Sequence, residues 1–206
     1  MFTQTLQEST KLVLDKISKL DVLNKFYLTG GTALALQIGH RESEDLDFFS
    51  ETSFKPEFIQ SELETIGSLE NVEISKGTLN CFVDNVKLQF LYYPYLLLEP
   101  KMELQNIQIS SKLDIACTKL ITISARGSKK DFIDIYFLLN EYDLLFLFEK
   151  LKEKYPKTNY NETHILKSLL YFADADNQPS PKMYKNIRWE EVKEKIVKKV
   201  KGFELE

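Results

Sequence analysis

The stretch Leu28–Ser50, LTGGTALALQIGHRESEDLDFFS, decides how the N-terminal half of this 206-residue chain folds. Gly30 and Gly31 separate a short apolar run from ALALQIG, whose residues favour a helix with Thr32 near its start and Gly39 near its end. The run DLDFFS that follows has the composition of a strand. We therefore expect a strand, a glycine turn, a helix and a second strand in this order.

Two aspartates, Asp45 and Asp47, stand on either side of Leu46 in the second of these strands. Because side chains alternate across a strand, Leu46 and Phe48 would enter the core while both carboxylates project from the opposite face. Two like charges so close repel unless one takes a proton or a cation lies between them, and a hard ion such as Mg²⁺ meets that need. The alternative is a pair of solvated aspartates on an exposed face, since a D-x-D pattern alone is common.

The glycine turn is a second feature beside this pair. Gly30 and Gly31 let the backbone approach a ligand closely, and the N–H groups that open the next helix favour an anion such as phosphate. Thr32 adds a hydroxyl donor. A pair of glycines is often only a tight turn, but a phosphate-binding turn beside a metal site is the arrangement that phosphoryl transfer requires.

The rest of the chain divides into a strand-rich part and a helical part. The elements that hydrophobic periodicity predicts are helices at 5–23 and 55–67, strands at 72–75, 78–84 and 86–93, and helices at 112–125, 129–140, 143–154, 162–173 and 189–201. A tight turn at Asp84–Asn85 joins the last two strands. We expect an α+β fold, with an α/β core carrying a mixed sheet in residues 1–100 and a helical domain in 101–206 that packs on this core and completes a cleft.

Composition limits the class of protein. The hydrophobic fraction of 43% and the aromatic fraction of 12% are typical of a globular chain, and the net charge of −4 argues against a generally basic nucleic-acid coat. No apolar run approaches the roughly 20 residues that span a membrane, and the N-terminus lacks a signal-peptide pattern. Cys81 and Cys117 are too few for a disulfide framework or a paired-cysteine zinc motif. We expect a cytoplasmic protein without a membrane partner.

The block GGTALALQIGHRESEDLDFF resembles the nucleotidyltransferases of the AbiEii/AbiGii toxin family, which belong to the polymerase-β-like superfamily. The family pattern is a GGT-A-L turn followed by H-R-x-S-x-D-L-D-F. The matching positions are Gly30, Gly31, Thr32, Ala33, Leu34, His40, Arg41, Ser43, Asp45, Leu46, Asp47 and Phe48. The resemblance implies a polymerase-β-like nucleotidyltransferase core followed by an α-helical C-terminal half.

A second block, LDIACTKLITISARGSKKDFIDIYFLL at 113–139, is similar to the second signature of that family. The matching positions are Asp114, Lys119, Arg126, Lys130, Asp131 and Asp134. The resemblance implies that Lys119 contacts a triphosphate, that Asp134 is a catalytic acid steering Lys119 or the incoming group, and that Arg126 and Lys130 bind phosphate or the acceptor. The structural alternative is a salt-bridge network of Asp114, Lys119 and Asp134 that holds two helices together.

The resemblance also implies roles in the first block. Asp45 and Asp47 would be catalytic and hold Mg²⁺, with Mn²⁺ as an alternative ion. The expected nucleotide-binding residues of this block are Gly30, Gly31, Thr32, Arg41 and Ser43. Arg41 is expected there because its planar fork suits a phosphate.

One departure from the superfamily pattern concerns a third metal carboxylate, which often comes from a later strand. In this chain that strand reads VKLQFLYYPY, with Gln89 at the expected position. An amide offers a neutral oxygen but cannot act as a base. Either Asp45, Asp47 and the substrate phosphates hold the metal, or Asp134 or Glu44 contributes, and the general base stays open.

The activity that the resemblance implies is metal-dependent transfer of a nucleotide from a nucleoside triphosphate to an acceptor hydroxyl. The protein would be the toxin of a toxin–antitoxin and phage-defence pair, acting on RNA at the 3′ end of tRNA, with a cognate antitoxin of the AbiEi type. One alternative is a nucleotidyltransferase for a protein or small-molecule hydroxyl. Another, prompted by Gln89, is a nucleotide-binding regulatory module that has lost catalysis.

Overall fold

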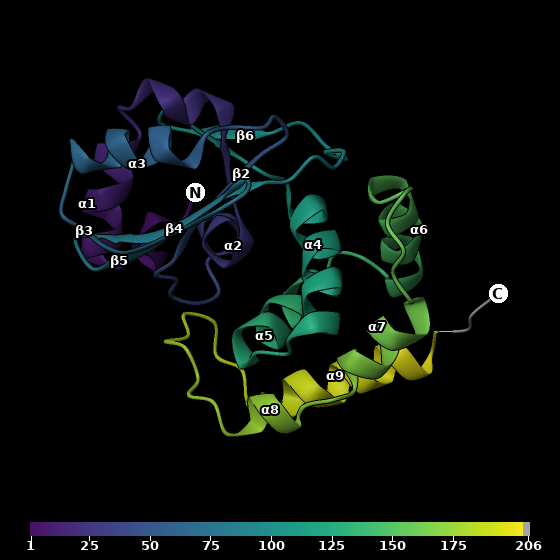
Figure 1. The fold of residues 1–206 in the computed structure, drawn as a ribbon. Coiled ribbons are helices and arrows are strands. Elements are labelled where there is room, and N and C mark those ends of the chain that lie inside the picture. The colour runs from purple at the N-terminus through teal and green to yellow at the C-terminus, as the bar shows by residue number, and fades with distance from the viewer. Residues whose placement is uncertain (204–206) are drawn as a thin grey trace.

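A seven-stranded mixed sheet and a set of helices make up residues 1–203, the part of the chain that the computed structural model describes. The strands are β1 (Tyr27–Thr29), β2 (Leu46–Ser50), β3 (Leu69–Ser75), β4 (Thr78–Val83), β5 (Val86–Tyr92), β6 (Met102–Leu104) and β7 (Ile107–Ile109). The α-helices are α1 (Glu8–Ile17), α2 (Gly30–Ile38), α3 (Pro56–Glu64), α4 (Lys112–Ala125), α5 (Lys129–Leu138), α6 (Leu144–Lys154), α7 (Glu162–Leu169), α8 (Ala173–Asp176) and α9 (Trp189–Lys201). Figure 1 shows α1, α2 and α3 around the sheet and the helices from α4 onward gathered beside it. The α+β class with a mixed sheet is confirmed.

The central strand of the sheet is β2, and the strand order is β3-β4-β5-β2-β1-β7-β6. β2 runs antiparallel to β1 and parallel to β5. Leu46 and Phe48 are fully buried, and the ring of Phe48 stacks on that of Phe90 with 5.1 Å between centroids. The apolar residues of β2 thus enter the core as predicted, which leaves Asp47 on the opposite face.

The hairpin between β4 and β5 also agrees with the prediction. Asp84 and Asn85 both have positive φ, 48° and 65°. Two consecutive residues of this kind form the tight turn whose twist matches that of the flanking antiparallel strands. Aspartate and asparagine tolerate this conformation better than most residues, which is why the turn could be predicted.

Two short strands, β6 and β7, were not predicted from the sequence. β7 pairs with β1 in parallel, and β6 pairs with β7, so the sheet continues to Ile109. The prediction that residues 101–206 form a helical domain is therefore wrong for 102–109, and the first helix of that half starts at Lys112. Strands of three residues carry almost no periodicity of their own, and a parallel pairing with a distant segment has no local signal.

Most of the helices follow the predicted periodicity. α4 and α9 span the predicted ranges 112–125 and 189–201. Two predicted helices are too long, because the one expected at 5–23 is confined to α1 and the one expected at 162–173 stops at the end of α7. In both cases apolar residues continue past the helix end. After α1, Val22 and Leu23 are buried by a short 3-10 turn, whereas after α7, Leu170 and Tyr171 are exposed.

The helix α4 joins the two halves of the molecule. It contacts α2 on the side of the sheet and α5, α6 and α7 on the other side. Ser111 and Ser128 cap the first turns of α4 and α5, and each side chain accepts a hydrogen bond from the N–H three residues later, of Asp114 and Asp131 respectively. These caps start both helices at defined residues and so set which of their side chains face the sheet.

The connection between α8 and α9 returns to the first half of the chain, as the yellow-green segment in Figure 1 shows. Met183 pairs with Arg41 through an isolated antiparallel bridge, and the N–H of Glu42 donates to the carbonyl of Lys182 at 2.8 Å. The N–H of Tyr184 donates to the carbonyl of His40 at 2.9 Å. The segment between α2 and β2 is thereby held by the connection between α8 and α9.

Two further observations concern the described residues as a whole. Within residues 1–203, no helix has the length and apolar content needed to cross a membrane. Cys81 and Cys117 are free and buried. The expected cytoplasmic location stays a prediction.

Candidate active site

The glycine turn joins β1 to α2 and faces Asp47. Gly30 has a φ of +69°, a conformation that glycine adopts without strain, and a Cβ at this position would lie within 3.0 Å of Asp47 Oδ2. A Cβ at Gly31 would lie equally close to the Nη2 of Arg41. Glycine is needed at both positions because a carboxylate and a guanidinium already occupy the space that a side chain would take.

The N-terminus of α2 is free of any side-chain cap. Thr29 occupies the N-cap position, but its Oγ1 accepts a hydrogen bond from the Ser110 hydroxyl at 2.8 Å instead. The first N–H groups of a helix have no acceptor within the helix and carry a partial positive charge. This end of α2 can therefore bind an anion such as phosphate.

The hydroxyls of Thr32 and Ser43 are directed toward the protein. Both side chains are buried, and their oxygens lie 2.8 Å apart. Thr32 Oγ1 also hydrogen-bonds to the main-chain carbonyl of Asp45. These two residues, predicted as nucleotide-binding, thus fix the segment before β2 against α2 and hold Asp45 in place.

Asp45 and Asp47 interact electrostatically at the start of β2. Asp45 lies one residue before the strand and is exposed, whereas Asp47 is half-buried against Gly30. Burial, and then the negative charge of Asp45, raise the pKa of Asp47 to about 6. A cation bound between the two carboxylates would remove this cost, as the sequence predicts.

Behind the turn lies a buried network of charges from α4, α5 and the segment before β2. Lys119 Nζ lies 2.6 Å from Asp131 Oδ1 and 2.7 Å from Asp134 Oδ2. The guanidinium of Arg41 donates to both oxygens of Asp134, at 2.7 and 2.8 Å, and its remaining nitrogen donates to the carbonyl of Glu42. The guanidinium of Arg41, which was predicted to bind phosphate, is thus bound to Asp134, and the Arg41 side chain is only 2% exposed.

The carboxylate at the centre of this network is ionised. Burial opposes the charge of Asp134, but Arg41 and Lys119 hold its pKa well below the usual range. Burial also opposes the charge of Lys119, yet Asp134 and Asp131 raise its pKa above the ordinary value. The alternative for the second signature was a salt-bridge network that joins two helices, and such a network is present. It contains Asp131 and Arg41 together with Lys119 and Asp134. Asp114 lies outside it and pairs with Lys154 at 2.6 Å.

The histidine of the motif belongs to the same network. His40 is fully buried, its Nε2 lies 2.7 Å from Asp134 Oδ1, and its Nδ1 has no hydrogen-bond partner within residues 1–203. Burial lowers the pKa of the imidazole. A neutral His40 that donates from Nε2 to Asp134 accounts for these contacts.

A cavity of about 390 Å³ opens between the sheet and α4, next to the glycine turn. Its polar lining comes from Gly30, Gly31, Asp47, Gln89, Thr118, Lys119, Thr122, Arg126 and Asp131. Its apolar lining comes from Phe49, Leu91, Tyr93, Ile115, Ile121 and Ala125. A cavity of this size, with a few charged groups and an apolar wall, is typical of a small-ligand site.

The predicted site residues divide into two groups around this cavity. Gly30, Gly31, Asp47, Lys119 and Arg126 line it. The others do not: Thr32, Arg41, Ser43 and Asp134 are buried behind it, whereas Asp45 and Lys130 are exposed outside its lining. Asp131 also lines the cavity, although the sequence predicts no role for it. The signal for it in the sequence is its spacing of three residues from Asp134, which places both carboxylates on one face of a helix.

Gln89 is the neighbour of Asp47 on β5, in register across the parallel pair. Its Nε2 donates to Asn80 Oδ1 at 2.9 Å, which leaves its Oε1 without a donor among the described residues. A set of two carboxylates and one amide oxygen consists of hard ligands, which suit Mg²⁺ when substrate phosphates and water complete the shell. Among residues 1–203, no cluster of three or more Asp, Glu, His and Cys residues could hold a metal. The donors present therefore fit a metal that binds together with a substrate.

The family was identified by comparison with known proteins. The model of the nucleotidyl transferase AbiEii toxin family, a type IV toxin–antitoxin system, matches residues 12–82 and 71–202. The chain belongs to this family. An uncharacterized protein of Aquifex aeolicus (strain VF5) is 39% identical over 206 residues, covering 96% of this chain and 97% of that protein.

Solved structures agree with this AbiEii assignment at the level of the fold. MenT4, a nucleotidyltransferase toxin of Mycobacterium tuberculosis H37Rv, superposes with a TM-score of 0.57 at 14% identity, over 96% of this chain and 87% of MenT4. JHP933 of Helicobacter pylori gives a TM-score of 0.53 at 16% identity, over 95% and 92%. ANT(2″)-Ia, in complex with adenylyl-2″-tobramycin, gives 0.50 at 13%, over 71% and 96%.

These comparisons confirm three predictions from the sequence, namely the AbiEii toxin family, the nucleotidyltransferase activity and the polymerase-β-like fold. A type IV toxin–antitoxin family implies a nucleoside triphosphate substrate and an antitoxin. Nucleotidyltransferases of this kind generally use a divalent metal ion.

Proposed function

We propose that this AbiEii protein transfers a nucleotide from a nucleoside triphosphate to an RNA hydroxyl, with Mg²⁺ held at Asp45 and Asp47. One observation supports the proposal above all: the carboxylate of Asp47 lies against Gly30 at the uncapped N-terminus of α2. Anion-binding N–H groups and a cation-binding carboxylate then open into the same cavity. Few chemistries other than phosphoryl transfer need both at one point.

The metal would be held by Asp45 and Asp47, with the amide oxygen of Gln89 close by. Mg²⁺, or Mn²⁺ in its place, would neutralise charge on the transferred phosphate and favour the ionised form of the acceptor hydroxyl. One or two carboxylates, together with substrate phosphates and water, are the usual ligands of Mg²⁺ in proteins.

The chain itself would hold the triphosphate and the leaving group. The N–H groups at Gly30 and Gly31 bind the β- and γ-phosphates, and Lys119 and Arg126 reach them from α4. A bond forms between the acceptor oxygen and the α-phosphorus, and the bond from the α-phosphorus to the bridging oxygen breaks. Pyrophosphate leaves with that oxygen, and Lys119 and Arg126 stabilise its charge.

The proton of the acceptor hydroxyl needs a base, and Gln89 cannot supply one. Asp47 is the carboxylate that faces both the glycine turn and the cavity, and we assign the proton to its Oδ atoms. Asp131 also lines the cavity, but it is paired with Lys119 and its pKa is lowered. It is therefore the weaker base.

Four predicted residues would act by position. Asp134, which Arg41 holds in place, positions Lys119 at the cavity wall, and Thr32 and Ser43 hold Asp45. Lys130, exposed at the start of α5, is left to contact the acceptor. In the cell we propose cytoplasmic action at the 3′ end of tRNA, toxicity linked to phage defence, and neutralisation by an AbiEi-type antitoxin.

The test is transfer of labelled nucleotides. The purified protein is incubated with each labelled nucleoside triphosphate, a divalent ion and total RNA, and the RNA is then analysed by gel and mass spectrometry. We expect labelled RNA that disappears with Asp45→Ala and Asp47→Ala but persists with Asp15→Ala, a change on the exposed face of α1. Labelling that survives both active-site changes would overturn the metal assignment.

Two other functions are separated by the same assay. Transfer to a protein or small molecule would label those acceptors in an RNA-free reaction. An inactive nucleotide-binding module, which Gln89 in place of a carboxylate favours, would bind the triphosphate without releasing pyrophosphate.

A further inference from the structure

A second cavity, of about 360 Å³, adjoins the first at the C-terminal end of α4. Ala125 and Arg126 line both cavities, so the two lie next to each other. The other wall comes from α7 and the residues after it, including His164, Lys167, Tyr171 and Asp174. His164 Nε2 lies 3.0 Å from the carbonyl of Ser124 and ties α7 to α4. We call this second cavity the α4–α7 groove.

The charge of the α4–α7 groove is unbalanced. Arg126 and Lys167 are exposed, and neither makes an ion pair within residues 1–203, while Asp174 is the single carboxylate in the lining. Unpaired cations beside a phosphoryl-transfer site attract a polyanion.

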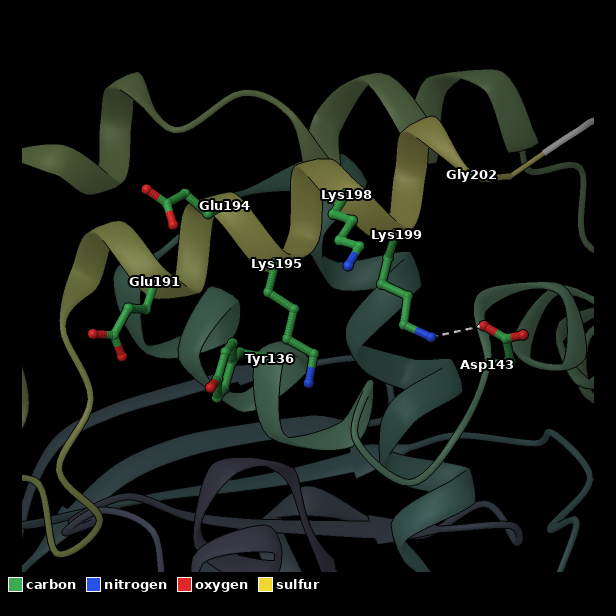
Figure 2. A pocket seen from close by; sticks show the side chains of 8 residues that line it. All are labelled: Tyr136, Asp143, Glu191, Glu194, Lys195, Lys198, Lys199 and Gly202. Atoms are coloured by element: carbon green, nitrogen blue, oxygen red, sulfur yellow. Dashed lines mark hydrogen bonds and ion pairs between the residues drawn. The ribbon is translucent and has the colours of Figure 1, made fainter.

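One other cavity has a comparable excess, since Lys25 and Lys55 line it without a carboxylate, but it shares no lining residue with the active-site cavity. Two further cavities lack this excess. The cavity between α5 and α9, shown in Figure 2, is lined by three lysines and three carboxylates, namely Lys195, Lys198, Lys199, Asp143, Glu191 and Glu194. Lys199 is paired with Asp143 at 3.0 Å, and Lys195 lies over the ring of Tyr136 at 4.5 Å. A cavity on β4 and β5 shares Gln89 with the first cavity. Its lining contains one lysine, Lys87, and one carboxylate, Glu73, so its charges balance.

An aromatic ring stands at the edge of the groove. Tyr171 is 57% exposed, and its ring contacts no other aromatic ring among the described residues. Solvent-exposed aromatic rings are common platforms for unpaired bases, because every base has a stacking face. A groove of this volume accommodates about one nucleotide, whereas a duplex is too wide to enter it.

We propose that the α4–α7 groove binds the single-stranded 3′ end of the acceptor RNA, with phosphates on Arg126 and Lys167 and a base on Tyr171. The inference rests on the proposed function and adds the side from which the acceptor enters. Arg126, between the two cavities, then contacts phosphates of both substrates. The terminal hydroxyl reaches Asp47 along the lining that the cavities share.

Binding without chemistry tests the groove. A 5′-fluorescein single-stranded RNA is titrated with the full chain, and anisotropy is read from about 50 to about 200 mM salt. Lys167→Ala should weaken binding and lower the salt slope by about 0.7, the value for one phosphate contact on a single strand. Tyr171→Ala should weaken binding about 5- to 150-fold with an unchanged slope, and Tyr171→Phe, which keeps the ring, should restore it.

Lysines of the cavity between α5 and α9 and of the cavity on β4 and β5 are matched controls. Lys198→Ala and Lys87→Ala should stay within about twofold of the unchanged protein. Binding that depends on Lys87 but not on Lys167 would place the acceptor on the sheet side and overturn the proposal. Equal RNA affinity in all variants would also overturn it.

A nucleotide titration and a transfer assay separate this inference from the proposed function. Calorimetry with a non-transferable triphosphate should give the same affinity for Lys167→Ala and the unchanged protein, and a loss of that affinity would assign the groove to the nucleotide. In transfer assays Lys167→Ala should raise KM for RNA at constant kcat. Groove-dependent RNA binding without any transfer would refute the proposed function alone, whereas transfer with normal KM in Lys167→Ala and Tyr171→Ala would refute the groove alone.

Discussion

The guanidinium of Arg41 donates two hydrogen bonds to the carboxylate of Asp134, from Nε to Oδ1 at 2.7 Å and from Nη2 to Oδ2 at 2.8 Å. Neither side chain is more than 2% exposed. Asp134 also receives Lys119, at 2.7 Å, so one carboxylate organises cations from two parts of the chain. The pair therefore connects the segment before β2 with α4 and α5, and it fixes the ammonium that lines the active-site cavity.

Asp134→Asn should be strongly destabilising. It leaves Arg41 and Lys119 buried with less negative charge nearby, and loss of one partner from a buried pair costs about 3–5 kcal/mol. Thermal unfolding followed by circular dichroism should show a midpoint lower by about 6–20 °C. Asp15→Asn, which removes the exposed pair with Lys19, should change stability by less than about 1 kcal/mol. Equal effects of the two changes would contradict the role given to Asp134.

The same pair predicts how stability depends on pH. Because the folded-state pKa of Asp134 is lowered, its contribution is complete above about pH 4 and is lost as the pH falls further toward the folded value. The advantage of the unchanged protein over Asp134→Asn should thus shrink below about pH 4, by up to about 1.4 kcal/mol per unit. Urea unfolding from neutral to acidic pH measures it. Curves that stay parallel throughout would refute the charge assignment.

Gly31→Ala should disturb the Arg41–Asp134 pair by displacing Arg41. The added methyl would fall within 3.0 Å of Arg41 Nη2, so the guanidinium has to leave its place on Asp134. We expect a loss of about 1–3 kcal/mol, measured by urea unfolding. Gly202→Ala is the matched change, since its Cβ would meet only ordinary contacts of 3.5 Å or more. A tolerated Gly31→Ala would show that the pair has room to move.

A divalent cation should stabilise the folded protein through Asp45 and Asp47. Binding to the folded state alone adds about 2.7 kcal/mol at a hundredfold excess over Kd, and each kcal/mol raises the unfolding midpoint by about 2–4 °C. A titration with Mg²⁺ in the presence of a non-transferable triphosphate, followed by differential scanning fluorimetry, should raise the midpoint of the unchanged protein and of Asp15→Asn. Asp45→Asn and Asp47→Asn should show little response. The same response in all four proteins would argue for ions bound elsewhere.

Without metal, Asp47→Asn should be more stable than the unchanged protein near neutral pH. Burial and Asp45 raise the pKa of Asp47 to about 6, so the ionised form is disfavoured in the folded state. Removing the charge should gain about 1 kcal/mol, in keeping with the usual cost of active-site groups to stability. Urea unfolding in the presence of a chelator measures the difference. A loss of stability would mean that the carboxylate is well satisfied without a cation.

Much of the local structure was predictable from residues that are neighbours in sequence. The helix over ALALQIG, the buried Leu46 and Phe48, and the turn at Asp84–Asn85 follow from short-range preferences, and the structure contains each of them. The helix starts at Gly30, two residues before the predicted Thr32. β6 and β7 were not predictable, because β7 is defined by its parallel pairing with β1. Asp131 was visible as a helix neighbour of Asp134, but only the fold shows that it lines the cavity.

The sequence by itself determined the turn, the two aspartates and the boundaries of α4 and α9, since periodicity, caps and glycine act over a few residues. Tertiary structure alone decided which charged groups face the cavity and which face each other. Arg41 and Asp134 are 93 positions apart in the chain, and no local rule could show that the predicted phosphate ligand would be bound to the predicted catalytic acid. The physical reason is that a buried charge takes the partner that long-range packing brings to it.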